Sequence, residues 1–137
     1  MHDLENALAD LFGEMARAMA ADGEGATKMM EVVVSGAPTD AIARECALAI
    51  TASPLVKSAV FGADPNWGRI LSTVGARAGA QGWPVDPFKA RVGLQGVTVF
   101  ADAAPVEFDR EALRARMRET RVDVLVALVA LAEGLAH

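Results

Sequence analysis

The sequence predicts an α/β (α+β) fold in which a mixed sheet is layered with helices on one face. Three observations lead to this prediction: a valine-rich run at residues 29–35, an apolar stripe at helical spacing in residues 39–52, and a strand–strand–helix–strand order after residue 88. Apolar residues make up 53% of the 137 residues, so the chain can bury one core but is short for two comfortable domains.

The N-terminal part predicts a helix, a turn and a strand. Large apolar residues recur at helical spacing between residues 4 and 19, which predicts an amphipathic helix over residues 3–20 with Asp3 as its N-cap. Two glycines around Glu24 then break the helix, because glycine tolerates the backbone angles of a tight turn. The β-branched content of the next segment predicts a strand that starts at Thr27 or Lys28 and ends at Ser35.

The middle of the chain predicts two helices separated by a loop. The first covers residues 39–52 and stops before Pro54, and the loop covers residues 53–63. Asp64 as N-cap and Pro65 at the first helical position predict the start of the second helix. Five apolar residues share one face of that helix: Trp67, Ile70, Leu71, Val74 and Ala78. Residues 79–87, rich in glycine and proline, predict a loop.

The C-terminal part predicts two strands, a helix and a final strand. Residues 89–94 and 97–101 form a hairpin through Gln95-Gly96. Asp109 is the expected N-cap of a helix that runs to about Glu119, with Phe108 and Leu113 as a hydrophobic staple. Residues 122–132 are nearly all apolar. Periodicity leaves helix and strand open there, and the valines favour a buried strand.

Composition argues against several classes of function. The net charge is −5 and the basic residues are dispersed, so no basic patch for nucleic acid is expected. The histidines, His2 and His137, stand at the ends of the sequence, which disfavours Cys-His, Ser-His-Asp and zinc chemistry. Cys46 lies on an apolar helix stripe and is interpreted as a small buried hydrophobe. No apolar run is long enough for a membrane span, and a cytoplasmic protein is the default expectation.

Two polar, glycine-marked segments are candidates for chemistry, each with a structural alternative. Glu24 between its glycines is either part of a surface turn, which composition favours, or a carboxylate presented to a cationic group. Lys28 and Lys57 could bind anions, although single lysines are more often solvated surface charges. Residues 64–70 form either a capped helix start with Trp67 packed inward, or a helix N-terminus that binds an anion with help from Asn66 and Arg69. Four arginines near the last predicted helix are interpreted as a solvated face: Arg114, Arg116, Arg118 and Arg121.

Three segments resemble the ornithine acetyltransferase family of arginine biosynthesis, also called the bifunctional glutamate N-acetyltransferases. They are residues 22–28, Asp-Gly-Glu-Gly-Ala-Thr-Lys; residues 53–59, Ser-Pro-Leu-Val-Lys-Ser-Ala; and residues 62–70, Gly-Ala-Asp-Pro-Asn-Trp-Gly-Arg-Ile. The resemblance covers essentially the whole chain and is weaker after Gly79. It implies a precursor that cuts itself before a threonine, which becomes the first residue of the β subunit and the nucleophile. This threonine takes acetyl from N-acetylornithine and passes it to glutamate.

The resemblance also implies residue roles and partners. Glu24 falls on the family's substrate-binding glutamate, and no catalytic residue is assigned in this chain. No cofactor and no metal are expected, with acetyl-CoA as a further donor in some members. Residues 1–37 would end the catalytic αββα layer, and residues 38–137 would form a smaller α/β domain. The expected partners are the α subunit, the remaining β-subunit segments and small amino-acid substrates, with neither nucleic acid nor membrane.

The sequence departs from the family pattern in ways that bear on activity. It begins with Met1, and Ser58 stands where threonine is expected. The family's C-terminal substrate-binding asparagine and terminal hydroxyl residue would lie beyond His137. The chain is therefore expected to be the later part of a β subunit without the nucleophile, inactive by itself. The alternative is a non-catalytic interaction or binding domain of the same fold. None of the threonines stands in a sequence like the family's self-cleavage site, and all of them are internal: Thr27, Thr39, Thr51, Thr73, Thr98 and Thr120.

Overall fold

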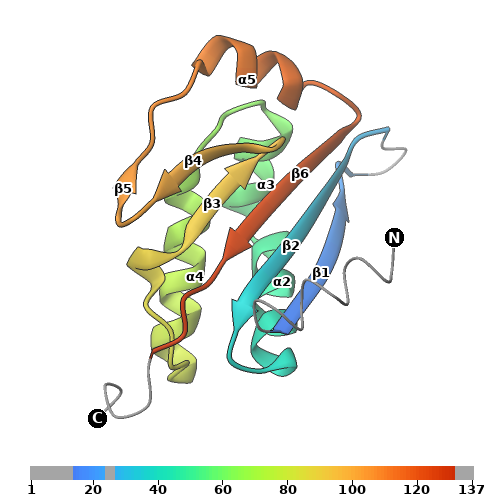
Figure 1. Cartoon of the computed structure of the whole chain (residues 1–137). Helices are drawn as coiled ribbons and strands as arrows, with labels where there is room; N and C mark the ends of the chain where they lie inside the picture. The colour runs from blue at the N-terminus through green and yellow to red at the C-terminus, as the bar shows by residue number, and fades with distance from the viewer. Residues whose placement is uncertain (1–13, 24–26, 132–137) are drawn as a thin grey trace.

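A six-stranded mixed sheet forms the centre of the computed structural model, which describes residues 14–23 and 27–131 (Figure 1). The strand order is β1-β2-β6-β3-β4-β5; β2 and β6 run parallel, and the other neighbours are antiparallel. This confirms the mixed sheet predicted from sequence. The strand bounds are β1 Glu14–Ala21, β2 Met29–Ala37, β3 Arg91–Leu94, β4 Val97–Ala101, β5 Ala104–Pro105 and β6 Arg121–Ala127.

Three helices cover one face of the sheet, as Figure 1 shows. They are α2 Asp40–Ala52, α3 Pro54–Phe61 and α4 Trp67–Gln81, and a short 3-10 helix, η1 Pro87–Lys89, follows α4. A further helix, α5 Arg110–Met117, lies at one end of the sheet and leads into β6. No described helix covers the opposite face of the sheet. The helices on one face are the layering that the sequence predicted.

The core lies between the sheet and the three covering helices. Val32, Val34 and Val124 point into it from the two parallel strands and are at most 1% exposed. The helices contribute residues such as Ile50 and Ile70, which are equally buried. Strand β6 alternates exposed and buried residues along its length, the period of a strand with one covered face. The prediction of a strand rather than a helix at residues 122–132 is therefore confirmed for β6.

The helix predicted over residues 3–20 is wrong where it can be compared. Residues 3–13 lie outside the described part of the chain, and residues 14–21 form strand β1. β1 pairs antiparallel with β2, with Arg17 opposite Val33. The segment is dominated by alanine and methionine, which have no strong strand preference, so local propensity pointed to a helix. Pairing with the edge of the valine-rich strand overrides that propensity.

The loop predicted over residues 53–63 is also wrong, because it contains helix α3. Pro54 ends α2 as predicted, yet it occupies the first position of α3, where a missing N–H has no consequence. The Ser53 side chain accepts a hydrogen bond from the backbone N–H of Val56 at 3.2 Å and caps the new helix. Proline therefore marks a change of direction between two helices rather than the start of a loop.

Two boundaries around α4 differ from prediction. The N-cap is Asn66, not Asp64, because the Asn66 side chain accepts the backbone N–H of Arg69 at 3.0 Å. The helix also continues through Gly79, which was expected to begin a loop, and ends where Gly82 adopts a left-handed conformation with φ 67°. Glycine within the helix is tolerated, whereas the left-handed position is what stops it.

Two further C-terminal predictions, the hairpin turn and the cap of the last helix, are confirmed, although that helix ends at Met117 and the first hairpin strand begins at Arg91. Gln95 and Gly96, with φ 51° and 77°, connect β3 and β4 as a hairpin turn. Asp109 caps α5 by accepting the N–H of Ala112 at 3.0 Å. The expected division of the chain into residues 1–37 and residues 38–137 stays a prediction. Strands from both ranges belong to one sheet. Within the described ranges, no helix has the length and apolar character that crossing a bilayer requires.

Candidate functional site

A groove of about 480 Å³ lies where the end of β1 meets helix α3. It brings together two of the three segments that resemble the family, the one beginning at residue 22 and the one at residues 53–59. Its lining residues are Ala21, Asp22, Gly23, Pro54, Lys57, Ser58 and Phe61. Because these segments are about thirty residues apart in the chain, their meeting is a result of the fold.

The loop after β1 is tied down on both sides. The backbone N–H of Asp22 donates to the carbonyl of Lys28 at 3.1 Å, which closes the loop. The Lys28 ammonium donates to the carbonyl of Phe61 at 3.3 Å, at the C-terminal end of α3. Gly23 has φ 79°, an angle that L side chains rarely adopt. Lys28 therefore joins the loop to α3.

The two charged side chains that line the groove have no hydrogen bond or ion pair within the described residues. Asp22 is exposed and contributes a carboxylate, and Lys57 is half-buried and contributes an ammonium group. They line the same groove without forming an ion pair with each other, since every ion pair among the described residues involves other side chains. The groove therefore offers one charge of each sign to a ligand.

Glu24, the expected substrate-binding residue, lies outside the described residues. Its role stays a prediction. Its chain neighbour Gly23 lines the groove. No other residue was assigned to the substrate from sequence.

Residues 64–70 hold neighbouring elements of the fold together. Asp64 forms an ion pair with Arg110 of α5 at 3.2 Å, and Arg114 donates to the carbonyl of Ala63 at 3.1 Å. Both contacts tie α5 to the loop before α4. Arg114 is thus a connecting residue rather than part of a purely solvated face, which corrects the sequence interpretation for this arginine.

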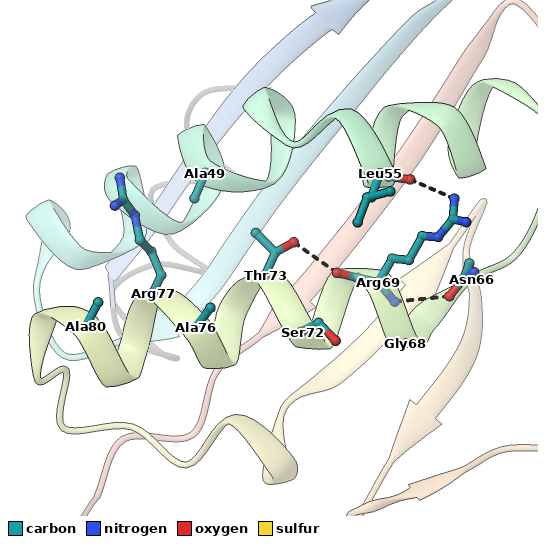
Figure 2. Close-up of a pocket in the computed structure, with 10 residues that line it drawn as sticks. All are labelled: Ala49, Leu55, Asn66, Gly68, Arg69, Ser72, Thr73, Ala76, Arg77 and Ala80. Carbon is teal, nitrogen blue, oxygen red and sulfur yellow. Dashed lines mark hydrogen bonds between the residues drawn. The ribbon is translucent and has the colours of Figure 1, made fainter.

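A hollow of about 740 Å³ lies along α4 on the outer side of the helices. Figure 2 shows its lining residues, most of which run from Asn66 at the start of α4 to Ala80 near its end. Arg69 crosses the hollow and donates to the carbonyl of Leu55 at 3.0 Å, so its guanidinium joins α4 to α3. The side chain of Asn66 already accepts a hydrogen bond from the backbone N–H of Arg69 at the helix start, so this N–H is not available to an anion. Trp67 is half-buried, and its ring stacks in a tilted arrangement on Phe100 with centroids 4.9 Å apart. These contacts favour the capped helix start over an anion-binding one.

Cys46 is 1% exposed in α2, and burial raises the pKa of its thiol from 9.0 to about 12. A thiol held protonated in this way is a poor nucleophile, which agrees with its interpretation as a buried hydrophobe. Among the described residues, no three His, Cys, Asp or Glu side chains come together as metal ligands would.

An ion-pair cluster on the helix-free face of the sheet was missed in the sequence. Glu31 of β2 is 7% exposed and bonds to Arg17 of β1 at 3.2 Å and to Arg121 of β6. Arg121 also pairs with Asp123 at 2.9 Å, and these two carboxylates raise the pKa of its guanidinium, Asp123 more than Glu31. A single acid inside a valine run was the available signal, because buried charges in strands require partners.

The fold places the chain in the class of layered α+β proteins with helices on one face of a mixed sheet. A solved structure of the arginine biosynthesis bifunctional protein argJ from Bacillus halodurans shares this fold with a TM-score of 0.65. It is 31% identical, over 83% of this chain and 57% of that one. The ArgJ family model matches residues 1–136, and the chain belongs to that family. The resemblance noted in the sequence is thereby confirmed.

Two curated relatives show the extent of the similarity. The arginine biosynthesis bifunctional protein ArgJ of Thermus thermophilus is 50% identical over 115 residues, which is 84% of this chain and 29% of the relative. The glutamate N-acetyltransferase of Methanopyrus kandleri is 40% identical over 129 residues, 92% of this chain and 32% of the relative. The chain therefore spans less than a third of the length of these relatives.

Proposed function

We propose that the chain is part of an acetyltransferase that moves acetyl from N-acetylornithine to glutamate in arginine biosynthesis. The observation that carries the proposal is the ArgJ family match over residues 1–136, with relatives named for arginine biosynthesis and for glutamate N-acetylation. In the proposed reaction a threonine hydroxyl attacks the acetyl carbonyl, forms an acetyl ester and releases the ornithine amine. The glutamate amine then attacks the ester and restores the hydroxyl. Acetyl-CoA as a further donor belongs to the same proposal.

The proposal places the nucleophilic threonine in another segment of the enzyme. Three threonine hydroxyls of this chain are engaged in its own helices. Thr39 caps α2 by accepting the N–H of Ile42 at 3.1 Å; Thr51 donates to backbone carbonyls of α2, and Thr73 donates to the carbonyl of Arg69 at 2.9 Å. A threonine whose hydroxyl is committed to helix backbone is poorly placed to attack a substrate. The proposal gives the chain an α subunit and the remaining β-subunit segments as partners.

The helix-free face of the sheet supports such an assembly. Met19 and Leu125 are 52% and 40% exposed on strands β1 and β6. Large apolar side chains on a sheet face that no described helix covers are typical of a surface that packs against another element. The same observation would suit the alternative, a non-catalytic interaction domain of the same fold, so activity has to separate the two.

The test is acetyl transfer from N-acetylornithine to glutamate by the complete enzyme that contains this sequence. Glu24→Gln should raise KM for the amino-acid substrates at least tenfold, because a neutral amide holds an ammonium group less well than a carboxylate does. Glu119→Gln, at an exposed position after α5, is the matched control and should leave the kinetics unchanged. Unchanged kinetics for Glu24→Gln would remove Glu24 from the site, and no transfer by the complete enzyme would favour the interaction domain.

A further inference from the structure

We propose that the groove between the end of β1 and helix α3 binds the charged head group of an α-amino acid, with Lys57 receiving the carboxylate and Asp22 the ammonium group. The inference rests on the proposed function and deepens it, because it assigns the groove to glutamate, the acetyl acceptor of that reaction, and to the ornithine that the reaction releases. The α-nitrogen of N-acetylornithine carries the acetyl group and offers no ammonium group to Asp22. None of the groove residues was given this role by the family resemblance.

The charges of the groove select the class of ligand. A phosphate or a plain carboxylic acid would meet the Asp22 carboxylate, and a plain amine would meet the Lys57 ammonium group. An α-amino acid carries both charges on neighbouring atoms and can satisfy both side chains at once. Neither side chain has another partner within the described residues, so binding would break no existing ion pair.

The neighbouring lysine explains why Lys57 is the carboxylate receptor. Lys28 also lies at this end of the sheet, but its ammonium group is held by the carbonyl of Phe61. The Lys57 ammonium group makes no hydrogen bond within the described residues, so of the two lysines it is the one left to receive a carboxylate.

The remaining walls suit the rest of an amino acid. Pro54 and Phe61 give the groove apolar surface for the methylene groups of a side chain such as that of glutamate or ornithine. Ser58 adds a hydroxyl group that makes no side-chain hydrogen bond within the described residues and can donate or accept. The groove thus combines two opposite charges, one neutral polar group and two apolar surfaces.

The experiment is an NMR titration of the full 137-residue chain, uniformly labelled with ¹⁵N, with L-glutamate and L-ornithine. Saturable shifts are expected at the backbone amides of Asp22, Gly23, Lys57 and Ser58. Glutarate, which lacks the ammonium group, and 1,4-diaminobutane, which lacks the carboxylate, should bind at least tenfold more weakly. The absence of saturable shifts with both amino acids, or equal binding of the single-charge analogues, would overturn the proposal.

Charge-removing variants provide the residue-level test. Lys57→Met keeps the aliphatic stem, and Asp22→Asn keeps the shape of the side chain; each should weaken L-glutamate binding at least tenfold. Lys57→Arg should restore most of the affinity. Lys89→Met, exposed at the end of η1, is the matched control and should bind as the parent chain does. Parent-like affinity of Lys57→Met would refute the assignment of Lys57.

The complete enzyme separates this proposal from the proposed function. Lys57→Met should raise KM for glutamate and leave kcat within about twofold, because the residue is proposed to bind and not to react. Acetyl transfer with an unchanged KM in Lys57→Met would overturn the groove assignment and leave the proposed function standing. Charge-dependent binding of amino acids to the chain, without acetyl transfer by the complete enzyme, would support the groove and overturn the proposed function.

Discussion

Gly36 lies near the end of β2, against the chain that leaves β6, and its replacement by alanine should strongly destabilise the fold. Its φ is +75°, and an added Cβ would lie 2.2 Å from the backbone oxygen of Leu128 and 3.2 Å from its carbonyl carbon. The backbone cannot move away freely, because the N–H of Leu128 donates to the carbonyl of Ser35 at 2.7 Å. The side chain therefore meets a fixed main chain rather than a flexible group.

The magnitude follows from two costs. A left-handed backbone conformation costs a non-glycine residue about 1–2 kcal/mol, and forcing an extra carbon into a packed position costs about 1–3 kcal/mol. The expected loss is about 2–5 kcal/mol from a folding free energy on the order of 5–15 kcal/mol. With a urea m-value of about 1–3 kcal/mol per molar, the midpoint of unfolding should fall by at least about 0.7 M.

Urea unfolding followed by circular dichroism measures this shift. The matched control is Gly79→Ala in α4, where an added Cβ meets nothing within 4 Å and the helix gains about 1 kcal/mol from the better helix former. The midpoint should therefore fall for Gly36→Ala and rise for Gly79→Ala. A midpoint for Gly36→Ala within about 0.3 M of the parent chain, well inside the shift expected from the m-value, would refute the reasoning about the close contact with Leu128.

Three further predictions concern buried and capping groups. Iodoacetamide should modify Cys46 in the unfolded chain and leave the folded chain unmodified at pH 8. Burial raises the pKa of the thiol from 9.0 to about 12, so the contribution of the protonated thiol to stability is complete below pH 9 and should be lost as pH rises toward 12. Urea midpoints measured across that pH range would show the loss. Glu31→Gln should lower the free energy of unfolding by about 1–2 kcal/mol at low salt, a small value because solvent screens its arginine partners, which are about half exposed. Equal stability of the variant and the parent chain would contradict a role for this cluster. Asn66→Ala should lower the free energy of unfolding by about 1 kcal/mol through loss of the α4 cap, whereas Asn66→Asp should retain most of it, and equal losses in a thermal scan would argue against capping.

Local chemistry in the sequence determined several elements without help from the fold. Valine-rich segments became β2 and β6, because β-branched side chains pack well on a pleated, buried surface. Asp109 capped its helix, and Gln95-Gly96 made its hairpin, since each depends on contacts within a few residues. Family membership was equally accessible, because it depends on strings of residues rather than on their position in space.

Elements without a strong local preference were decided by the tertiary structure. β1 is built of residues that fit helix and strand alike, and only hydrogen bonding to β2 made it a strand. The segment after Ser53 looked like a loop because proline ends one helix, yet packing of Val56 and Val60 against the core made it a second helix. Such outcomes depend on partners distant in the chain, which a short sequence window does not contain.

The candidate site shows the same division. The sequence singled out the segment at residues 22–28 and the lysine at position 57, each with a plain surface interpretation beside the functional one. Only the fold brought Asp22 and Lys57 to one groove, while it committed Lys28 to the carbonyl of Phe61. The physical reason is that the packing of α3 against the sheet sets which charges are left without partners, and sequence spacing does not contain that information.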